Sequence, residues 1–243
     1  MHIVVLIKQV PATDNVRMDQ ETGTMVRTGQ NNIMNPLDEN ALAEAVRIKE
    51  TVPGVSITAI SMGPESAGKV FKEAVALGAD AGILVTGRAF AGSDTIATAR
   101  ALAVAVAKAG PADLILCGER ATEGETGQTG VMVAATLDLP VQTCVSRIDV
   151  ADGRVRVVRT VEDGFEKVEV PFPVLVSVVK DINQPGFPTL DGKSRARSVP
   201  VTVWGPEELG LAPDETGLKG SPTRVVKIFS PRLTREDVLR KHG

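Results

Sequence analysis

Apolar runs of strand length alternate with helical patterns through the first two-thirds of the chain. The expected strands cover residues 2–7, 55–61, 82–86, 113–117 and 141–145, and segments with helical spacing separate them. Strands that alternate with helices favour a parallel sheet covered on both faces. We therefore expect an α/β fold with a doubly wound, mostly parallel sheet.

Two of the expected helices carry clear start signals. In NPLDENALAEAVRIKE, Asn35 is expected to cap the helix and Pro36 suits its first position. In GSDTIATARALAVAVAKAG, Ser93 is expected to be the cap, with Asp94 behind it.

The pattern changes after residue 145. Alternating apolar strands joined by Asp-Gly turns at 152–153 and 163–164 predict an antiparallel extension of the sheet. From residue 181 the chain is rich in Pro, Gly and charge and loses its periodicity, so we expect it to lie on a partner. The expected division is a domain of residues 1–200 that includes the extension, followed by an extended C-terminal arm, 201–243.

The connection between residues 8 and 34 is long for a loop inside a compact domain. Val16, Met18, Met25 and Val26 alternate as in a small hairpin. The hairpin either lies in solvent or lines a ligand crevice, because it leaves the carboxyl end of the first strand.

Composition excludes several classes of protein. The chain has 243 residues, 43% of them hydrophobic, which is ample for a buried core. A formal charge of −3, from 27 basic and 30 acidic residues, argues against a general nucleic-acid surface. The longest apolar stretches are of strand length and the first residues lack a charged signal-peptide region, so we expect no membrane span and a cytoplasmic protein.

Histidine and cysteine are too few for most side-chain chemistry. Cys117 and Cys144 lie in apolar strands and are expected to be reduced, buried thiols. His2 and His242 lie at the two ends, which excludes a Ser-His-Asp triad, a Cys-His pair and a histidine-ligated zinc unless a terminus folds back. A bound cofactor is therefore the expected source of any chemistry.

The loop GERATEGETGQTG, residues 118–130, connects an expected strand to an expected helix. In a parallel sheet such a loop lies where ligands bind, and the helix N-terminus attracts anions. Glu119, Glu123 and Glu125 would repel a phosphate unless they accept hydrogen bonds from ribose or adenine. The loop matches neither the P-loop nor the G-x-G-x-x-G pattern. From spacing alone, it is either a nucleotide-binding loop or a flexible connection.

Several motifs in order resemble one family, the beta subunit of electron-transfer flavoprotein. They are VLIKQVP, NPLDENALAEAVRIKE, AISMGPE, LILCGERATEGETGQTGVMVAATLDLP, QPGFPTL and GLKGSPTRVVKIFSP, and they span nearly the whole chain. The resemblance implies an adenine nucleotide alpha hydrolase-like fold and a heterodimer with an alpha subunit that carries a flavin. The loop has Gly-Glu-Arg where many members have Gly-Lys-Gln, and Thr-Glu-Gly-Glu in place of an Ile-Asp-Gly-Asp type run.

The resemblance also implies which residues hold an adenine nucleotide. They are Leu6, Asn35, Pro36, Leu37, Asp38, Met62, Gly118, Arg120, Ala121, Thr122, Glu123, Gly124, Glu125, Thr126, Gly127, Gln128 and Thr129. The acidic members would accept hydrogen bonds from ribose or adenine, and the amides of 124–129 would bind the phosphates.

The family has two branches, which differ in cofactor. In the conventional branch the beta subunit holds AMP as a structural ligand, and the complex passes electrons from acyl-CoA dehydrogenases in fatty acid oxidation. In the bifurcating branch the beta subunit holds FAD, which accepts a hydride from NADH and sends electrons to ferredoxin or flavodoxin and to the alpha-subunit FAD.

The segment GRAFAGSDTIATARAL, residues 87–102, resembles the bifurcating branch. Hydroxyls and amides of Ser93, Asp94, Thr95 and Thr98 would hold a second phosphate or the ribityl chain, although Ser-Asp-Thr is also a plain helix cap. Arg88 and Phe90 would lie near the isoalloxazine or the nicotinamide. No side chain is expected to be catalytic, and NADH-dependent oxidoreductase activity is expected only in complex with the alpha subunit.

Partner contacts are implied as well. Leu190 aligns with the loop leucine that docks into an acyl-CoA dehydrogenase-type partner, and Arg195 and Arg197 follow it; alternatively, Leu190 packs under its own loop. The tail with Trp204 would lie over the alpha subunit. Two other classes stay open: a nucleotide hydrolase or adenylating enzyme, which the absence of a P-loop disfavours, and a nucleotide-binding module without a redox role.

Overall fold

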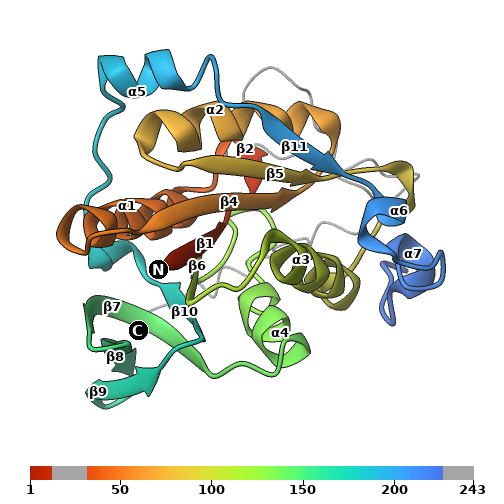
Figure 1. The fold of residues 1–243 in the computed structure, drawn as a ribbon. Helices are drawn as coiled ribbons and strands as arrows, with labels where there is room; N and C mark the ends of the chain where they lie inside the picture. Colours follow the sequence, from red (N-terminus) through yellow and green to blue (C-terminus); the bar gives the residue numbers. More distant parts are fainter. Residues whose placement is uncertain (13–31, 227–243) are drawn as a thin grey trace, which may run out of the picture.

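A computed structural model describes residues 1–12 and 32–226 of the protein. In this part of the chain one nine-stranded sheet has the order β11-β5-β4-β1-β6-β10-β7-β8-β9 (Figure 1). The parallel strands are β1 (His2–Leu6), β4 (Ser56–Met62), β5 (Ala81–Val85), β6 (Leu114–Gly118), β10 (Val174–Val178) and β11 (Val201–Trp204). The α/β class and the mostly parallel sheet are confirmed.

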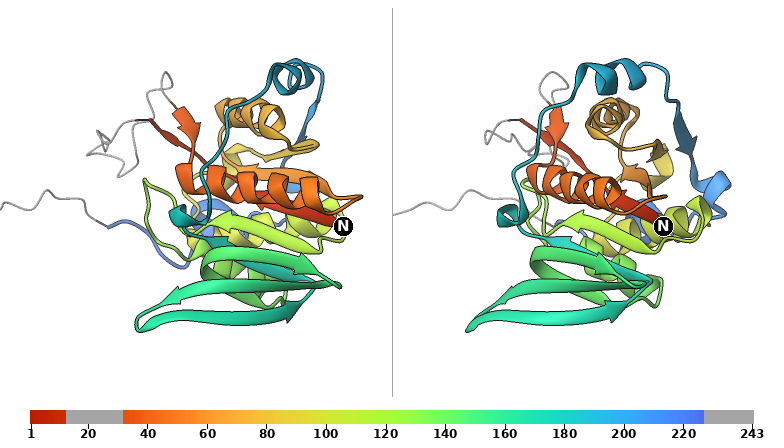
Figure 2. Two further views of the ribbon diagram at one scale, coloured as in Figure 1. Left: turned by 90° about the vertical axis from the view of Figure 1, so that its left-hand side faces the viewer. Right: turned by 60° about the vertical axis from the view of Figure 1, so that its left-hand side comes forward.

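The antiparallel extension is a three-stranded meander at one end of the sheet, opposite β11 (Figure 2). β7 (Val141–Ala151) pairs in parallel with β10 and antiparallel with β8 (Arg154–Val161), which pairs with β9 (Gly164–Pro171). The turns fall at the predicted Asp-Gly pairs, where Asp152 and Gly153 both have positive φ.

Helices cover both faces of the parallel part. Along β1, Ile3 and Val5 pack in a core with α1 (Pro36–Thr51) and α2 (Gly68–Leu77). Val4 and Leu6 point to the opposite face, which α3 (Thr95–Ala109) and α4 (Thr129–Thr136) cover. This alternation along a single fully buried strand is the doubly wound arrangement. Among the helices of the described residues, none combines the length and the apolar character needed to cross a bilayer.

The strand β10 corrects the sequence prediction. The run EKVEVPFPVLVSVVK was expected to belong to the antiparallel strands, but the chain breaks at Pro173 and β10 enters between β6 and β7. All five residues of β10 are buried, as in a strand covered on both faces. A continuous apolar run, rather than an alternating one, was the signal for this position.

The start of α3 corrects a second prediction. Asp94, rather than Ser93, is the N-cap: its Oδ1 accepts hydrogen bonds from the amides of Ile96 and Ala97, both at 3.0 Å. The Ser93 hydroxyl instead donates to the carbonyl of Phe90 at 2.8 Å.

The segment after residue 181 has short elements of its own, contrary to expectation. They are α5 (Leu190–Arg195), β11, α6 (Pro206–Leu209) and α7 (Gly217–Gly220), which follow the 3-10 turn η3 (Lys180–Ile182). β11 pairs with β5, and the Lys108 ammonium lies 5.4 Å from the ring centroid of Trp204. Trp204 thus packs on its own chain, while the wrapping of an arm around a second subunit stays a prediction.

Two expected features fall outside the described residues. The hairpin around Val16, Met18, Met25 and Val26 is one of them, and only the flanking strands β2 (Gln9–Pro11) and β3 (Asn32–Met34), which pair antiparallel, are described. The end of the C-terminal arm, 227–243, is the other.

Candidate functional site

The candidate site is a cleft at the carboxyl ends of the parallel strands. β1 has β4 on one side and β6 on the other, and the helices that follow β1 and precede β6 cover opposite faces of the sheet. This is a topological switch point, where open α/β sheets bind ligands. The described residues enclose a cleft of about 1100 Å³ there.

Most of the residues that the resemblance implied line this cleft. They are Leu6, Asn35, Asp38, Met62, Arg88, Phe90, Ser93, Asp94, Thr95, Thr98, Gly118, Arg120, Ala121, Gly124, Glu125, Thr126, Gly127, Gln128 and Thr129. Pro36, Leu37, Thr122 and Glu123 do not line it. Whether the lining residues bind a cofactor stays a prediction.

Several lining residues were missed by the sequence analysis. Lys8, the turn 63–66 after β4, Thr86 after β5, and Cys117 could have been found from the carboxyl-end rule alone. Thr223 had no such signal, because it comes from the segment after α7 and reaches the cleft only through tertiary packing.

The loop 118–130 is folded by local backbone turns. The amide of Glu125 donates to the carbonyl of Ala121 at 2.9 Å, and Glu125 and Gly127 have positive φ angles of 47° and 61°. Backbone of this kind turns successive N–H groups toward one side, which suits an anion. α4 begins at Thr129, directly after the turn, and its first amides open toward the same cleft.

Two buried side chains at the start of α1, Asn35 and Asp38, form hydrogen bonds to the backbone of this loop. Asn35 was expected to cap α1, but its side chain makes no cap hydrogen bond. Its Nδ2 donates to the carbonyl of Arg120 at 3.0 Å, and its Oδ1 accepts from the amide of Thr122 at 3.2 Å. Asp38 Oδ1 accepts from the amide of Gly118 at 3.0 Å. The polar atoms of this motif therefore contact backbone rather than solvent.

The acidic residues of the loop differ in position. Glu119 and Glu125 line the cleft. The carboxylate of Glu123 lies 2.5 Å from the Lys8 ammonium, and its side chain is only 4% exposed. Glu119 and Glu125 are thus the loop carboxylates placed for a ligand, and Glu123 ties the loop to the end of β1.

The opposite end of the cleft is formed by the turn η2 (Arg88–Phe90) and the start of α3. Phe90 is buried there and Arg88 is exposed. Asp94 Oδ2 accepts from both the amide and the hydroxyl of Thr223, at 3.0 and 2.7 Å, so both of its oxygens are used within the chain. Thr95 and Thr98 place hydroxyls in the same wall.

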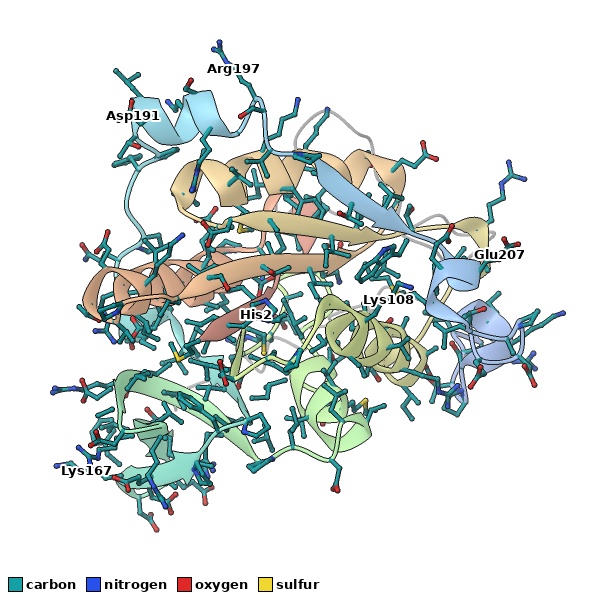
Figure 3. All side chains as sticks on the ribbon, viewed as in Figure 1. His2, Lys108, Lys167, Asp191, Arg197 and Glu207 are labelled. Atoms are coloured by element: carbon teal, nitrogen blue, oxygen red, sulfur yellow. The ribbon has the colours of Figure 1, made fainter. Side chains whose placement is uncertain are left out.

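The predicted partner residues do not share one environment. Leu190 is 85% exposed and the nearby Phe187 is 97% exposed, so Leu190 is not packed under its own loop. Arg195 Nη2 donates to the carbonyls of Val75 and Ala79, at 2.9 and 3.1 Å, and so closes the end of α2. Arg197 extends outward from α5 (Figure 3).

The candidate metal ligands and nucleophiles within the described part of the chain include His2, Cys117 and Cys144. The described residues form no group of His, Cys, Asp and Glu suited to a metal ion. His2 lies at the far end of β1, with its Nε2 2.9 Å from the Thr58 hydroxyl. Cys117 and Cys144 are free thiols; Cys117 is buried as expected, whereas Cys144 is only partly buried. Burial, with a smaller contribution from Asp38, raises the pKa of Cys117. The cleft can bind and orient a molecule that carries its own reactivity.

A doubly wound sheet with a glycine-rich loop over its switch-point cleft defines the class of α/β proteins that bind a nucleotide or cofactor. The family model described as the electron transfer flavoprotein domain matches residues 22–209. The chain belongs to the electron transfer flavoprotein family and groups with its beta subunits, and this membership implies a flavin or nucleotide cofactor.

Three relatives illustrate the range of this family. The electron transfer flavoprotein subunit beta of Thermoanaerobacterium thermosaccharolyticum is 44% identical over 97% of this chain and 90% of its own length. The caffeyl-CoA reductase-Etf complex subunit CarD of Acetobacterium woodii is 42% identical over 95% of this chain and 88% of its own length. Protein FixA of Azotobacter vinelandii is 39% identical over 100% of this chain and 89% of its own length.

Proposed function

We propose that this chain is the beta subunit of a heterodimeric electron-transfer flavoprotein of the bifurcating type, and that FAD binds in its cleft. Bound FAD would supply the chemistry of this proposal: acceptance of a hydride, which carries two electrons, from NADH. One electron would then go to ferredoxin or flavodoxin, and the other through the alpha-subunit FAD to an acyl-CoA dehydrogenase-type partner.

The extent of the cleft carries the proposal. It runs without a break from the loop 118–130 to η2 and the start of α3, with a volume of about 1100 Å³. Small-molecule sites usually occupy roughly 300–1,000 Å³, so this cleft is large for a mononucleotide. AMP on the loop would leave the walls at Arg88, Thr95 and Thr98 without a ligand.

The residues present fit both halves of a dinucleotide. The amides of 124–129 and the start of α4 suit phosphates, and Glu119 or Glu125 can accept from ribose or adenine hydroxyl and amino groups. At the other end, the hydroxyls of Thr95 and Thr98 suit a polyol chain, with Arg88 and Phe90 beside the ring. Bound FAD would supply the redox chemistry, while these residues orient it and limit its contact with water.

The proposed partners agree with the names of relatives. CarD is described as a subunit of a caffeyl-CoA reductase-Etf complex, and a protein of Anaerotignum propionicum, 37% identical over 95% of this chain, as an acryloyl-CoA reductase electron transfer subunit. The exposed Leu190 is a suitable apolar anchor for such a reductase or dehydrogenase, with Arg197 as a nearby charge. In this proposal the described C-terminal segment leads into an arm that lies over the alpha subunit.

Cofactor content tests the proposal. The complex purified with its alpha subunit is denatured, and released FAD and AMP are counted per heterodimer. Two FAD and no AMP are expected, and NADH should bleach the flavin of the beta subunit. One FAD with one AMP would refute the bifurcating assignment and indicate a conventional electron-transfer flavoprotein. A chain that binds nucleotide but never copurifies with an alpha subunit would point to a module without a redox role.

A variant pair localises the second flavin. Thr98→Val removes a cleft hydroxyl, whereas Thr136→Val removes a hydroxyl on the exposed end of α4, bonded to its own helix at the carbonyl of Met132. Only Thr98→Val should lower the FAD content of the beta subunit. Equal FAD content in both variants would argue against a flavin at the start of α3.

A further inference from the structure

One buried carboxylate connects the two strands that flank the switch point. Asp38 Oδ2 accepts from the amide of Lys8, after β1, at 2.8 Å, and its Oδ1 accepts from the amide of Gly118, at the end of β6, at 3.0 Å. The residue is 6% exposed. A single side chain from α1 thus fixes the relative position of both sides of the cleft floor.

The fit around this carboxylate is close. A Cβ atom at Gly118 would lie 2.6 Å from Asp38 Oδ1 and 2.7 Å from the Cβ of Leu37, so only glycine allows the approach. Asn35, one turn earlier on the same helix end, holds the next part of the loop at Arg120 and Thr122. The start of α1 therefore acts as a template for residues 118–122.

We propose that Asp38 is a positioning residue whose ionised carboxylate sets the conformation of the loop 118–130, and that it affects cofactor binding by holding that loop in place. The part that concerns the cofactor rests on the proposed function. The part that concerns the loop does not, because the hydrogen bonds are made within the chain.

Ionisation changes what Asp38 can hold. The ionised carboxylate accepts at both oxygens, whereas the protonated acid has a hydroxyl that must itself donate. Burial raises the pKa of Asp38 to about 7, against the smaller lowering effects of Asn35, the amides of Gly118 and Lys8, and the Lys8 charge. The change of state therefore falls within an accessible pH range.

Other charged or titratable groups near Asp38 are few in the described part of the chain. Lys8 faces it from the end of β1, with its ammonium on Glu123, and the Cys117 thiol faces it from β6. Nearby in sequence, Arg120 Nη1 lies 3.3 Å from Glu119 Oε1 in the loop, and Glu39 is the next residue on α1. Burial, with a smaller effect of Glu73, also raises the pKa of Glu39. The Asp38→Asn variant keeps Glu39, so any pH effect that persists in this variant does not come from Asp38.

The ionisation of Asp38 changes the stability of the fold in a definite direction. The folded-state pKa of Asp38 lies above its usual 3.8, so its stabilising contribution is present below about pH 3.8 and is lost as pH rises through about 7. Ionisation thus lowers global stability while it adds a second acceptor, so that the amides of both Lys8 and Gly118 can be bonded at once. Asp38→Asn should be at least as stable as the wild type at pH 8, yet hold the loop less well.

Amide hydrogen exchange of the full chain tests the role of Asp38. The variants are Asp38→Asn and, as a matched control, Asp113→Asn, because Asp113 also accepts from a backbone amide, that of His2 at 2.7 Å, at the other end of the sheet. Asparagine keeps one acceptor oxygen, so at pH 8 Asp38→Asn should make at least one of the two amides bonded to Asp38, those of Lys8 and Gly118, exchange several-fold faster, as expected for the loss of one hydrogen bond to a charged acceptor. Asp113→Asn should leave them unchanged.

The pH profile separates positioning from a general structural effect. After correction for intrinsic exchange rates, protection of the amide that loses its acceptor should fall about fivefold in the wild type between pH 8 and pH 6, because Asp38 is mostly ionised at the first pH and mostly protonated at the second, and this change should be absent in Asp38→Asn. A wild-type profile that is flat, or one that persists in Asp38→Asn, would overturn the proposal. If Asp38→Asn did not fold, the pH dependence of amide protection in the wild type, with Asp113→Asn as control, would still test whether ionisation of Asp38 holds these amides.

Cofactor retention is read separately. Asp38→Asn should release its bound nucleotide or flavin about tenfold more readily than Asp113→Asn does. If the wild-type complex releases neither FAD nor AMP on denaturation, the proposed function fails, and the exchange data still decide whether Asp38 positions the loop. If exchange changes as expected but retention does not, the effect of Asp38 on the cofactor is refuted.

Discussion

Replacing Asp94 with alanine should loosen two parts of the cleft wall at once. Its Oδ1 accepts from the amides of Ile96 and Ala97 and so caps α3, while its Oδ2 accepts from the amide and hydroxyl of Thr223. The hydroxyl of Ser221 also accepts from the Asp94 amide at 2.8 Å, a backbone contact that alanine keeps. The substitution would therefore free the helix start and weaken, without removing, the attachment of the C-terminal segment.

The magnitude follows from these contacts. Loss of an N-cap side chain costs about 1 kcal/mol. The two hydrogen bonds to Thr223 add about 1 kcal/mol, because this edge of the site is partly exposed and water replaces much of what is lost. A total near 2 kcal/mol corresponds to a fall in Tm of roughly 4–8 °C for a chain of this size.

The pH dependence of the effect has a predicted direction. Burial acts to raise the pKa of Asp94, but the hydrogen bonds from Ala97 and Thr223 outweigh it and hold the pKa below its usual value. The stabilising contribution is therefore present above about pH 3.8 and is lost as pH falls through the lower folded-state pKa. The difference in Tm between wild type and Asp94→Ala should be full at pH 7 and shrink below pH 3.8.

Thermal unfolding and amide exchange are the assays, with Ser93→Ala as the control. Among the described residues, the Ser93 hydroxyl bonds to the carbonyl of Phe90 alone, so Ser93→Ala should cost less than Asp94→Ala and leave the Thr223 amide protected. A cost for Ser93→Ala equal to that of Asp94→Ala would refute the assignment of the cap. An unchanged exchange rate at Thr223 in Asp94→Ala would refute the link to the C-terminal segment.

Three further substitutions have distinct expected outcomes. Gly130→Ala would place a Cβ 2.6 Å from the Cys117 sulfur, so it should lower Tm, and Cys117→Ala should restore part of the loss in the double variant. Arg195→Ala frees two carbonyls at the end of α2 and should lower the free energy of unfolding by about 1–3 kcal/mol in denaturant melts, whereas Arg197→Ala should not. Leu190→Ala should leave Tm unchanged, because the side chain is 85% exposed. The same variant should transfer electrons more slowly to or from an acyl-CoA dehydrogenase-type partner, and an unchanged rate would argue against docking at Leu190.

Much of the parallel sheet could be predicted from the sequence. Buried strands and amphipathic helices show characteristic spacings of hydrophobic residues in the sequence. The strand predicted at residues 2–7, for example, differs from β1 by one residue. The carboxyl-end rule then located the cleft and the loop 118–130. These successes depend on local pattern and on a general property of parallel sheets.

The failures share a different cause, which is tertiary competition for polar groups. Asn35 has the right type and place for a helix cap, yet the backbone at Arg120 and Thr122 takes its side chain. Ser93 and Asp94 are both good caps in isolation, and Thr223, far along the chain, is one of the partners that fix Asp94 at the start of α3. No local pattern contains these partners.

The central position of β10 constrains the order in which the chain can assemble as it leaves the ribosome. The β7–β9 meander can form its internal pairs early, because its three strands are neighbours in sequence, but it cannot join the parallel sheet until β10 has been made and inserted between β6 and β7. Until then β6 presents an open parallel edge, and β5 presents another until β11 is made. A chain that stalls before residue 174 would therefore expose the unpaired edge of β6, which can pair with another chain and so favours aggregation.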